Sequence, residues 1–108
     1  MKKSEVQSKL IGNEKYKYTV EFTNAFKRDV VNIVKHNWDL KLLENTIKTL
    51  ATKGKLPPEY KPHKLEGNFH GYWECHIKGD WLMVWRQTDS TLTLMLTNTG
   101  THTYIFGM

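Results

Sequence analysis

The chain has 108 residues, and its 16 lysines and arginines outnumber its 11 aspartates and glutamates to give a formal net charge of +5. This length corresponds to one domain with one packed core, and an apolar fraction of 39% is too high for a disordered chain. Because no apolar run approaches the roughly 18 residues of a membrane span and the N-terminus lacks the apolar core of a signal peptide, we expect a cytoplasmic protein without membrane association.

Residues 1–15 are polar and weakly patterned. We interpret them as an N-terminal extension, either flexible or a short helix, ahead of a domain over residues 16–108. That domain opens with Tyr16–Thr23, where β-branched and aromatic residues with partial alternation predict a strand.

Two amphipathic helices are predicted after this strand. Apolar residues recur at helical spacing behind a candidate N-cap at Thr23 or Asn24. A second apolar stripe follows a candidate N-cap at Asp39 and stops at Gly54. Both stripes need a sheet to cover them.

The second half of the chain has strand patterning. Tyr72–Lys78 alternates, which places Glu74 and His76 on one face. The Gly-Asp pair that follows favours a two-residue hairpin turn. The continuous apolar run Trp81–Trp85 is typical of a central strand that is covered on both faces.

A further strand places Leu92, Leu94 and Leu96 on one face, Gly100 interrupts it, and Thr103–Phe106 is predicted to be a short final strand. The order of the elements predicts an α+β domain. We expect a small antiparallel sheet with two N-terminal helices packed on one face and the other face partly open.

Three histidines, His63, His76 and His102, fall where this topology can bring them together, with Glu74 beside His76 and Asp80 at the hairpin turn. Cleavage of RNA by its own 2′-hydroxyl needs a base, an acid for the leaving 5′-oxygen, and donors around the phosphorane. Histidine suits both proton transfers near neutral pH, and the net positive charge suits a polyanionic partner. Residue types alone leave this reaction and histidines scattered over the surface as open interpretations.

A zinc site is the competing interpretation of the histidines and carboxylates. However, the chain lacks HExxH-like spacing, only Glu74 and His76 are locally placed for coordination, and the lone Cys75 excludes a CxxC pair. Cys75 shares its side of the strand with Trp73 and Ile77, so we interpret it as a core residue and not as a nucleophile. We expect no metal and no cofactor.

Two segments, PPEYKPHKLEGNFHGYWECHIKGDWLMVW and TGTHTYIFG, carry four motifs in order. They are a Tyr-Lys-x-His-x-Leu loop, a Gly-Tyr-x-(Glu/Asp)-x-His strand, an Asp-Trp turn and a Thr-Gly-(Thr/Ser)-His near the end. At this spacing they resemble the YafQ branch of the RelE superfamily, the toxins of type II toxin–antitoxin pairs. The resemblance runs from about Tyr16 to Gly107.

The resemblance implies a small twisted antiparallel sheet with N-terminal helices. It also implies a toxin that cuts messenger RNA in the ribosomal A site by metal-independent 2′-hydroxyl attack. Carried over by motif, His63 is expected to act as general base and His102 as general acid, although the sequence leaves the reverse assignment open. His76 and Asp80 would orient groups and stabilise charge, and Glu74 belongs to the same strand-and-turn group.

Substrate contacts are also implied. Phe106 would stack on a base or be a core aromatic, and for Trp81 a role in the core is favoured over substrate contact. Asn98 stands where the family generally carries an arginine, and its amide can donate a hydrogen bond but brings no charge. The cations that could compensate are Arg86, Lys61, Lys64 and Lys78. Without compensation the protein would be an attenuated variant.

The implied partners are a cognate antitoxin that inhibits the toxin, the ribosome and messenger RNA, with operator DNA bound only through the antitoxin. The alternative function is a catalytically attenuated protein of the same fold that binds the ribosome or the antitoxin without cleavage. A metal-dependent hydrolase is the third interpretation.

Overall fold

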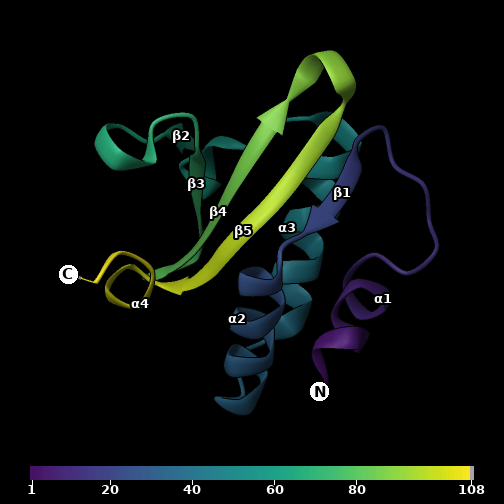
Figure 1. The fold of residues 1–108 in the computed structure, drawn as a ribbon, viewed down its shortest axis with the longest axis vertical. Helices are drawn as coiled ribbons and strands as arrows, with labels where there is room; N and C mark the ends of the chain where they lie inside the picture. The colour runs from purple at the N-terminus through teal and green to yellow at the C-terminus, as the bar shows by residue number, and fades with distance from the viewer. Residues whose placement is uncertain (108) are drawn as a thin grey trace.

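A computed structural model describes residues 1–107 of the chain. In chain order the main elements are α1 (Val6–Leu10), β1 (Thr19–Phe22), α2 (Asn24–Lys35), α3 (Leu40–Lys53), β2 (His63–Lys64), β3 (Trp73–Lys78), β4 (Trp81–Thr88), β5 (Thr93–Thr101) and α4 (His102–Phe106). The strands form one five-stranded sheet in the order β1-β5-β4-β3-β2. Figure 1 shows α2 and α3 next to each other on one side, while α4 and the segment around β2 lie toward the other.

This architecture confirms the predicted α+β class, but one pair of strands differs from the expected antiparallel sheet. β1 pairs with β5 in parallel, with Thr19 opposite Thr93 and Phe22 opposite Leu96. The other three pairs are antiparallel. Two helices and three strands separate β1 from β5 along the chain. No tight turn therefore forces this pair to be antiparallel.

The two central helices begin and end at the predicted signals. The side chain of Thr23 accepts a hydrogen bond from the Phe26 amide at the start of α2, and that of Asp39 accepts one from the Lys41 amide at the start of α3. α3 ends at Gly54 in the left-handed conformation (φ 73°). The apolar stripes of both helices are buried against the sheet, with Phe26, Val30, Ile33, Leu43, Ile47, Leu50 and Ala51 in the core. No helix within residues 1–107 is both long and apolar enough to cross a membrane.

The N-terminal segment contains a short helix, α1. Its side chains Val6 and Leu10 are completely buried, and Ile11 directly after the helix is buried as well. Figure 1 shows α1 beside α2, and all three residues belong to the same hydrophobic core as the two long helices. Of the two expectations for this segment, the helix is the one that the structure contains.

β4 is buried along the whole run Trp81–Trp85, as the sequence predicted for a central strand. Met83 and Trp85 join the core between the sheet and the helices, whereas Leu82 and Val84 are equally buried but lie outside that core cluster. Because successive side chains alternate between the two faces, Leu82 and Val84 lie on the opposite face of the sheet. That face is therefore covered in part.

Three local predictions near the C-terminus are wrong. Gly100 does not interrupt the last strand, because β5 continues through it to Thr101. Leu92 ends a 3₁₀ turn, η4 (Asp89–Thr91), in the left-handed conformation and is 38% exposed, so it does not share the buried face of Leu94 and Leu96. Residues 103–106 form a helix and not a strand, because Thr101 caps α4 by accepting from the Tyr104 amide and Gly107 ends it at positive φ.

Candidate active site

His63 and Glu74 are brought together by the pairing of β2 with β3, in which they lie directly opposite each other. His63 Nε2 is 3.6 Å from Glu74 Oε1. The histidine is half exposed, whereas the carboxylate is only 6% exposed on the face of the sheet that carries Leu82 and Val84. The sequence contains both residues but gives no indication of this contact.

The hydrogen bond of the second ring nitrogen of His63 defines its tautomer. His63 Nδ1 lies 3.0 Å from the carbonyl oxygen of Lys61, which can only accept, so the neutral ring carries its proton on Nδ1. Nε2 then has a free lone pair, and it is the nitrogen that faces Glu74. The imidazole is thus arranged to take up a proton at Nε2 next to a carboxylate.

His102 reaches the same region from α4. His102 and Phe106 are one helical turn apart, with ring centroids 4.8 Å apart, and Phe106 meets Phe69 edge-on at 4.7 Å. His102, Phe106, Phe69 and Glu74 line one hollow of about 400 Å³, together with Leu65, Glu66 and Asn68. This hollow links the loop histidine, through Glu74, to the histidine of α4.

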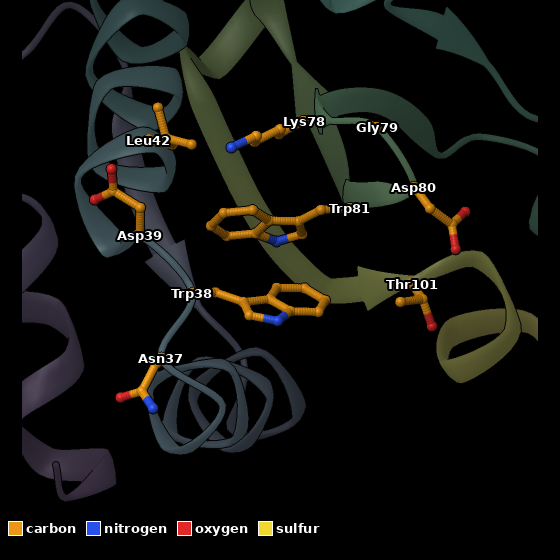
Figure 2. A pocket seen from close by; sticks show the side chains of 9 residues that line it. All are labelled: Asn37, Trp38, Asp39, Leu42, Lys78, Gly79, Asp80, Trp81 and Thr101. Carbon is orange, nitrogen blue, oxygen red and sulfur yellow. The ribbon is translucent and has the colours of Figure 1, made fainter.

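His76 and Asp80 lie at the hairpin end of the sheet. His76 is two residues beyond Glu74 on the same face of β3, about 7 Å along the strand. Its Nδ1 is 3.1 Å from the carbonyl oxygen of Gly79, so its Nε2 is again the free nitrogen. Asp80 is exposed in the turn, and Figure 2 shows its carboxylate pointing away from Trp38 and Trp81.

Trp81 is a core residue, the role that the sequence favoured. It is 6% exposed, its Nε1 donates to Thr99 Oγ1 at 2.9 Å, and its ring lies 5.1 Å from that of Trp38. Both indoles line a pocket of about 560 Å³ beside the hairpin. Figure 2 shows the Lys78 ammonium above the two rings. Since Trp81 belongs to the core under the helices, it faces away from the hollow that holds His102.

The candidate cations are distributed over different surfaces. Lys64 follows His63 on β2, so its side chain leaves from the opposite face, and its Nζ lies over the Trp73 ring at 5.7 Å. Arg86 shares the face of Val84, two residues further along β4, and its guanidinium stacks on Tyr72 at 5.1 Å. Lys61 is exposed next to the β2 strand. Arg86 therefore lies on the face of the sheet that carries Glu74 and His76, whereas the Lys64 side chain does not.

Asn98 forms a hydrogen bond with Asp29, a residue that was not predicted from the sequence. Its Nδ2 donates to Asp29 Oδ2 at 3.2 Å, and Asp29 is a carboxylate on α2 that is only 1% exposed. The sequence does contain a sign that Asp29 is buried. It falls three residues after Phe26 and directly before Val30, on the apolar stripe of its helix. A carboxylate on a buried stripe requires hydrogen-bond donors.

Cys75 is fully buried, and this burial raises the pKa of its thiol to about 12. A thiol that stays protonated at neutral pH is a poor nucleophile, which agrees with the assignment of Cys75 to the core. Within residues 1–107, no three His, Cys, Asp or Glu side chains lie close enough together to hold a metal ion.

A family model for the bacterial toxin YafQ of type II toxin–antitoxin systems matches residues 18–107. The chain belongs to the YafQ toxin family. The mRNA interferase toxin YafQ of Escherichia coli K12 is 32% identical over 89 residues, which cover 82% of this chain and 95% of that protein. Residues 1–17, including α1, lie outside the match to the family model.

Solved toxin structures share the fold. A metal-bound toxin from Helicobacter pylori is 38% identical with a TM-score of 0.75, covering 82% of this chain and 99% of its own. The toxin–antitoxin complex DinJ–YafQ from Escherichia coli is 31% identical with a TM-score of 0.73, covering 84% of this chain and 99% of the matched one. The RelE-like fold implied by the motifs is thus confirmed.

Proposed function

We propose that this YafQ-family toxin is a ribosome-dependent endoribonuclease that cleaves messenger RNA in the A site by attack of the 2′-hydroxyl on the adjacent phosphate. The observation that carries the proposal is that Glu74 and His102 line one hollow, while His63 Nε2 lies 3.6 Å from Glu74 Oε1. The similarity to the mRNA interferase YafQ of Escherichia coli supports the substrate class.

His63 is the proposed general base. Its Nε2 carries the lone pair because Nδ1 donates to the Lys61 carbonyl. When Nε2 takes the 2′-hydroxyl proton, the bond from the 2′-oxygen to phosphorus forms, and Glu74 at 3.6 Å can pair with the new imidazolium. A positioned base of this kind contributes about 10²–10⁴ to the rate.

His102 is the proposed general acid. It gives its proton to the 5′-oxygen as the bond from phosphorus to that oxygen breaks, which leaves a 2′,3′-cyclic phosphate and a 5′-hydroxyl. Phe106, one turn along α4, would stack on a base and hold the nucleotide extended for in-line attack. His76 and Arg86 would donate to the phosphate. Asp80 would orient the groups that do.

An antitoxin partner is part of the proposal. The Escherichia coli relative is known in a complex of toxin with the antitoxin DinJ. We expect this chain to be neutralised in the same way by a cognate antitoxin that wraps it with a helical or extended segment. Co-expression of that antitoxin should relieve any growth arrest caused by the toxin.

The test is expression of the full chain in bacteria, with primer extension on a translated message. The wild type should stop growth and create new 5′ ends, and His63→Ala or His102→Ala should lower cleavage about 10²–10⁴-fold. His36→Ala is the matched control, since His36 ends α2, bonds the Asn32 carbonyl and does not line the hollow. Intact message with the wild type, or undiminished cleavage by His102→Ala, would contradict the proposal.

One observation favours the second candidate, a binding protein of the same fold that does not cleave. Asn98 brings no charge, and one of its amide hydrogens is used by Asp29. Losing a cation from a phosphoryl site costs about 10²–10³ in rate, by analogy with lost oxyanion donors. Primer extension separates the candidates, because the binding protein would occupy ribosomes without creating new 5′ ends.

A further inference from the structure

Asp29 is a buried carboxylate whose partners are all neutral. Its Oδ1 accepts from the Tyr104 hydroxyl at 2.7 Å, and its Oδ2 accepts from the Thr99 amide at 3.1 Å and from Asn98 Nδ2 at 3.2 Å. No lysine, arginine or histidine within residues 1–107 forms an ion pair with it. Three hydrogen bonds to one charged group are strong, and each donor is held at a defined place.

These donors come from the end of β5 and from α4. β1 pairs with β5 only as far as Leu96, so β5 has no neighbouring strand on that side beyond this point. Asp29 accepts the Thr99 amide hydrogen there. The carboxylate thus takes the place of the missing strand at the point where β5 leads into α4.

α4 depends on contacts of this kind. It has five residues, and none of them is buried, so it cannot be stable as an isolated helix. The Tyr104 ring packs on Gly100, where an added Cβ would lie 2.8 Å from Tyr104 Cδ2. Its hydroxyl then reaches Asp29, and this bond raises the pKa of Tyr104. The phenol therefore remains a donor at neutral pH.

The face of α4 that bears Tyr104 is opposite the face that bears His102. His102 and Phe106 are four residues apart and share one face, whereas Tyr104 is two residues away, about 200° around the helix. One face is held by Asp29 and Gly100, and the other lines the hollow with Phe69 and Glu74. The Asp29 bond therefore limits rotation of α4 about its axis.

We propose that the hydrogen bond from Tyr104 to Asp29 positions His102 by fixing the orientation of α4, so that Asp29 and Tyr104 are positioning residues for the general acid. Its catalytic consequence rests on the proposed function. The orientation of α4 can be tested separately from catalysis.

The test variant is Tyr104→Phe, which removes the hydroxyl and keeps the ring on Gly100. It leaves Asp29 two donors, so the fold is retained, whereas Asp29→Ala would leave three buried or half-buried donors without an acceptor. Tyr18→Phe is the matched control, because the Tyr18 hydroxyl makes the same kind of bond to Asp89 at 2.6 Å. That bond lies beside η4, at the other end of β5 from α4.

Two readouts are needed, one of which does not depend on cleavage. In NMR spectra of the full chain, Tyr104→Phe should shift the amide signals of α4 and the imidazole signals of His102, and Tyr18→Phe should leave them in place. Unchanged His102 signals in Tyr104→Phe would overturn the positioning claim, whether or not the wild type cleaves RNA.

The second readout is single-turnover cleavage. A displacement of about 1 Å can cost about 10²-fold in rate, so Tyr104→Phe should cleave about tenfold to a hundredfold more slowly at saturating message, with little change in the concentration needed for saturation. In the His102→Ala background the same change should have no further effect, because the group that is positioned is absent. An equal loss in both backgrounds would overturn the proposal and indicate a general structural role.

Discussion

Asn98 stands at the position where the resemblance to the toxin family predicts an arginine. The Asn98 amide donates to Asp29 at the edge of β5, while its register partner is Val84, on the face that also carries Glu74. A longer, charged side chain at this position could reach the face of the histidines. The asparagine therefore contributes to the anchoring of β5 and supplies no positive charge to the site.

Replacement of Asn98 by arginine should raise activity. If the missing cation limits the rate, Asn98→Arg should speed message cleavage by about tenfold or more, since a full cation is worth about 10²–10³ and pairing with Asp29 would reduce the gain. Asn98→Gln is the control for length without charge. Rates measured by primer extension that are equal in all three proteins would indicate that Arg86 or Lys61 already provides the charge.

At the level of elements, α1 and the residue after it contribute side chains to the core. Val6, Leu10 and Ile11 are buried with residues of α2 and α3, yet this segment precedes the range that matches the YafQ family model. We propose that the segment is a stabilising extension of the domain, because burial of apolar side chains is the main favourable term in folding.

Leu10→Ala tests this role. Removal of a fully buried leucine side chain should lower the free energy of unfolding by about 2–5 kcal/mol, measured by urea denaturation followed by circular dichroism. The neighbouring Lys9 is exposed, so Lys9→Ala should stay within about 0.5 kcal/mol of wild type. A Leu10→Ala protein as stable as Lys9→Ala would mean that the segment is not docked in solution.

For the whole molecule, the net charge of +5 is carried mainly by lysine, which provides 14 of the 16 cations. Lysines contact phosphates as point charges, so binding to RNA should depend strongly on salt. This dependence applies to any RNA that the proposed function would engage.

Affinity for a single-stranded RNA, measured by fluorescence anisotropy, should fall linearly in a plot of log K against log salt, with a slope of about 0.7 per neutralised phosphate. Arg86→Gln should make that slope shallower by about 0.7, the value of one phosphate contact, since Arg86 lies on the face of Val84. Lys41→Gln should leave it unchanged, since Lys41 pairs with Glu44 on α3 at 3.4 Å. Equal slopes for the two variants would mean that RNA does not bind the face of the sheet that carries Arg86.

The sequence by itself determined the elements that depend on local signals. The N-caps Thr23 and Asp39, the C-terminal Gly54 and the apolar run of β4 act within a few residues of chain, so periodicity and capping rules locate them. The ordered motifs indicated the family, which the comparison with known toxins confirmed.

Tertiary structure alone decided the parallel pairing of β1 with β5, the contact of His63 with Glu74 and the three hydrogen bonds to Asp29. It also decided that Lys64 lies away from the histidines, since its side chain leaves from the opposite face of β2. Each of these depends on register and on contacts between residues far apart in the chain. Local propensity carries no information about such contacts, because they form only when the sheet and its two helices are packed together.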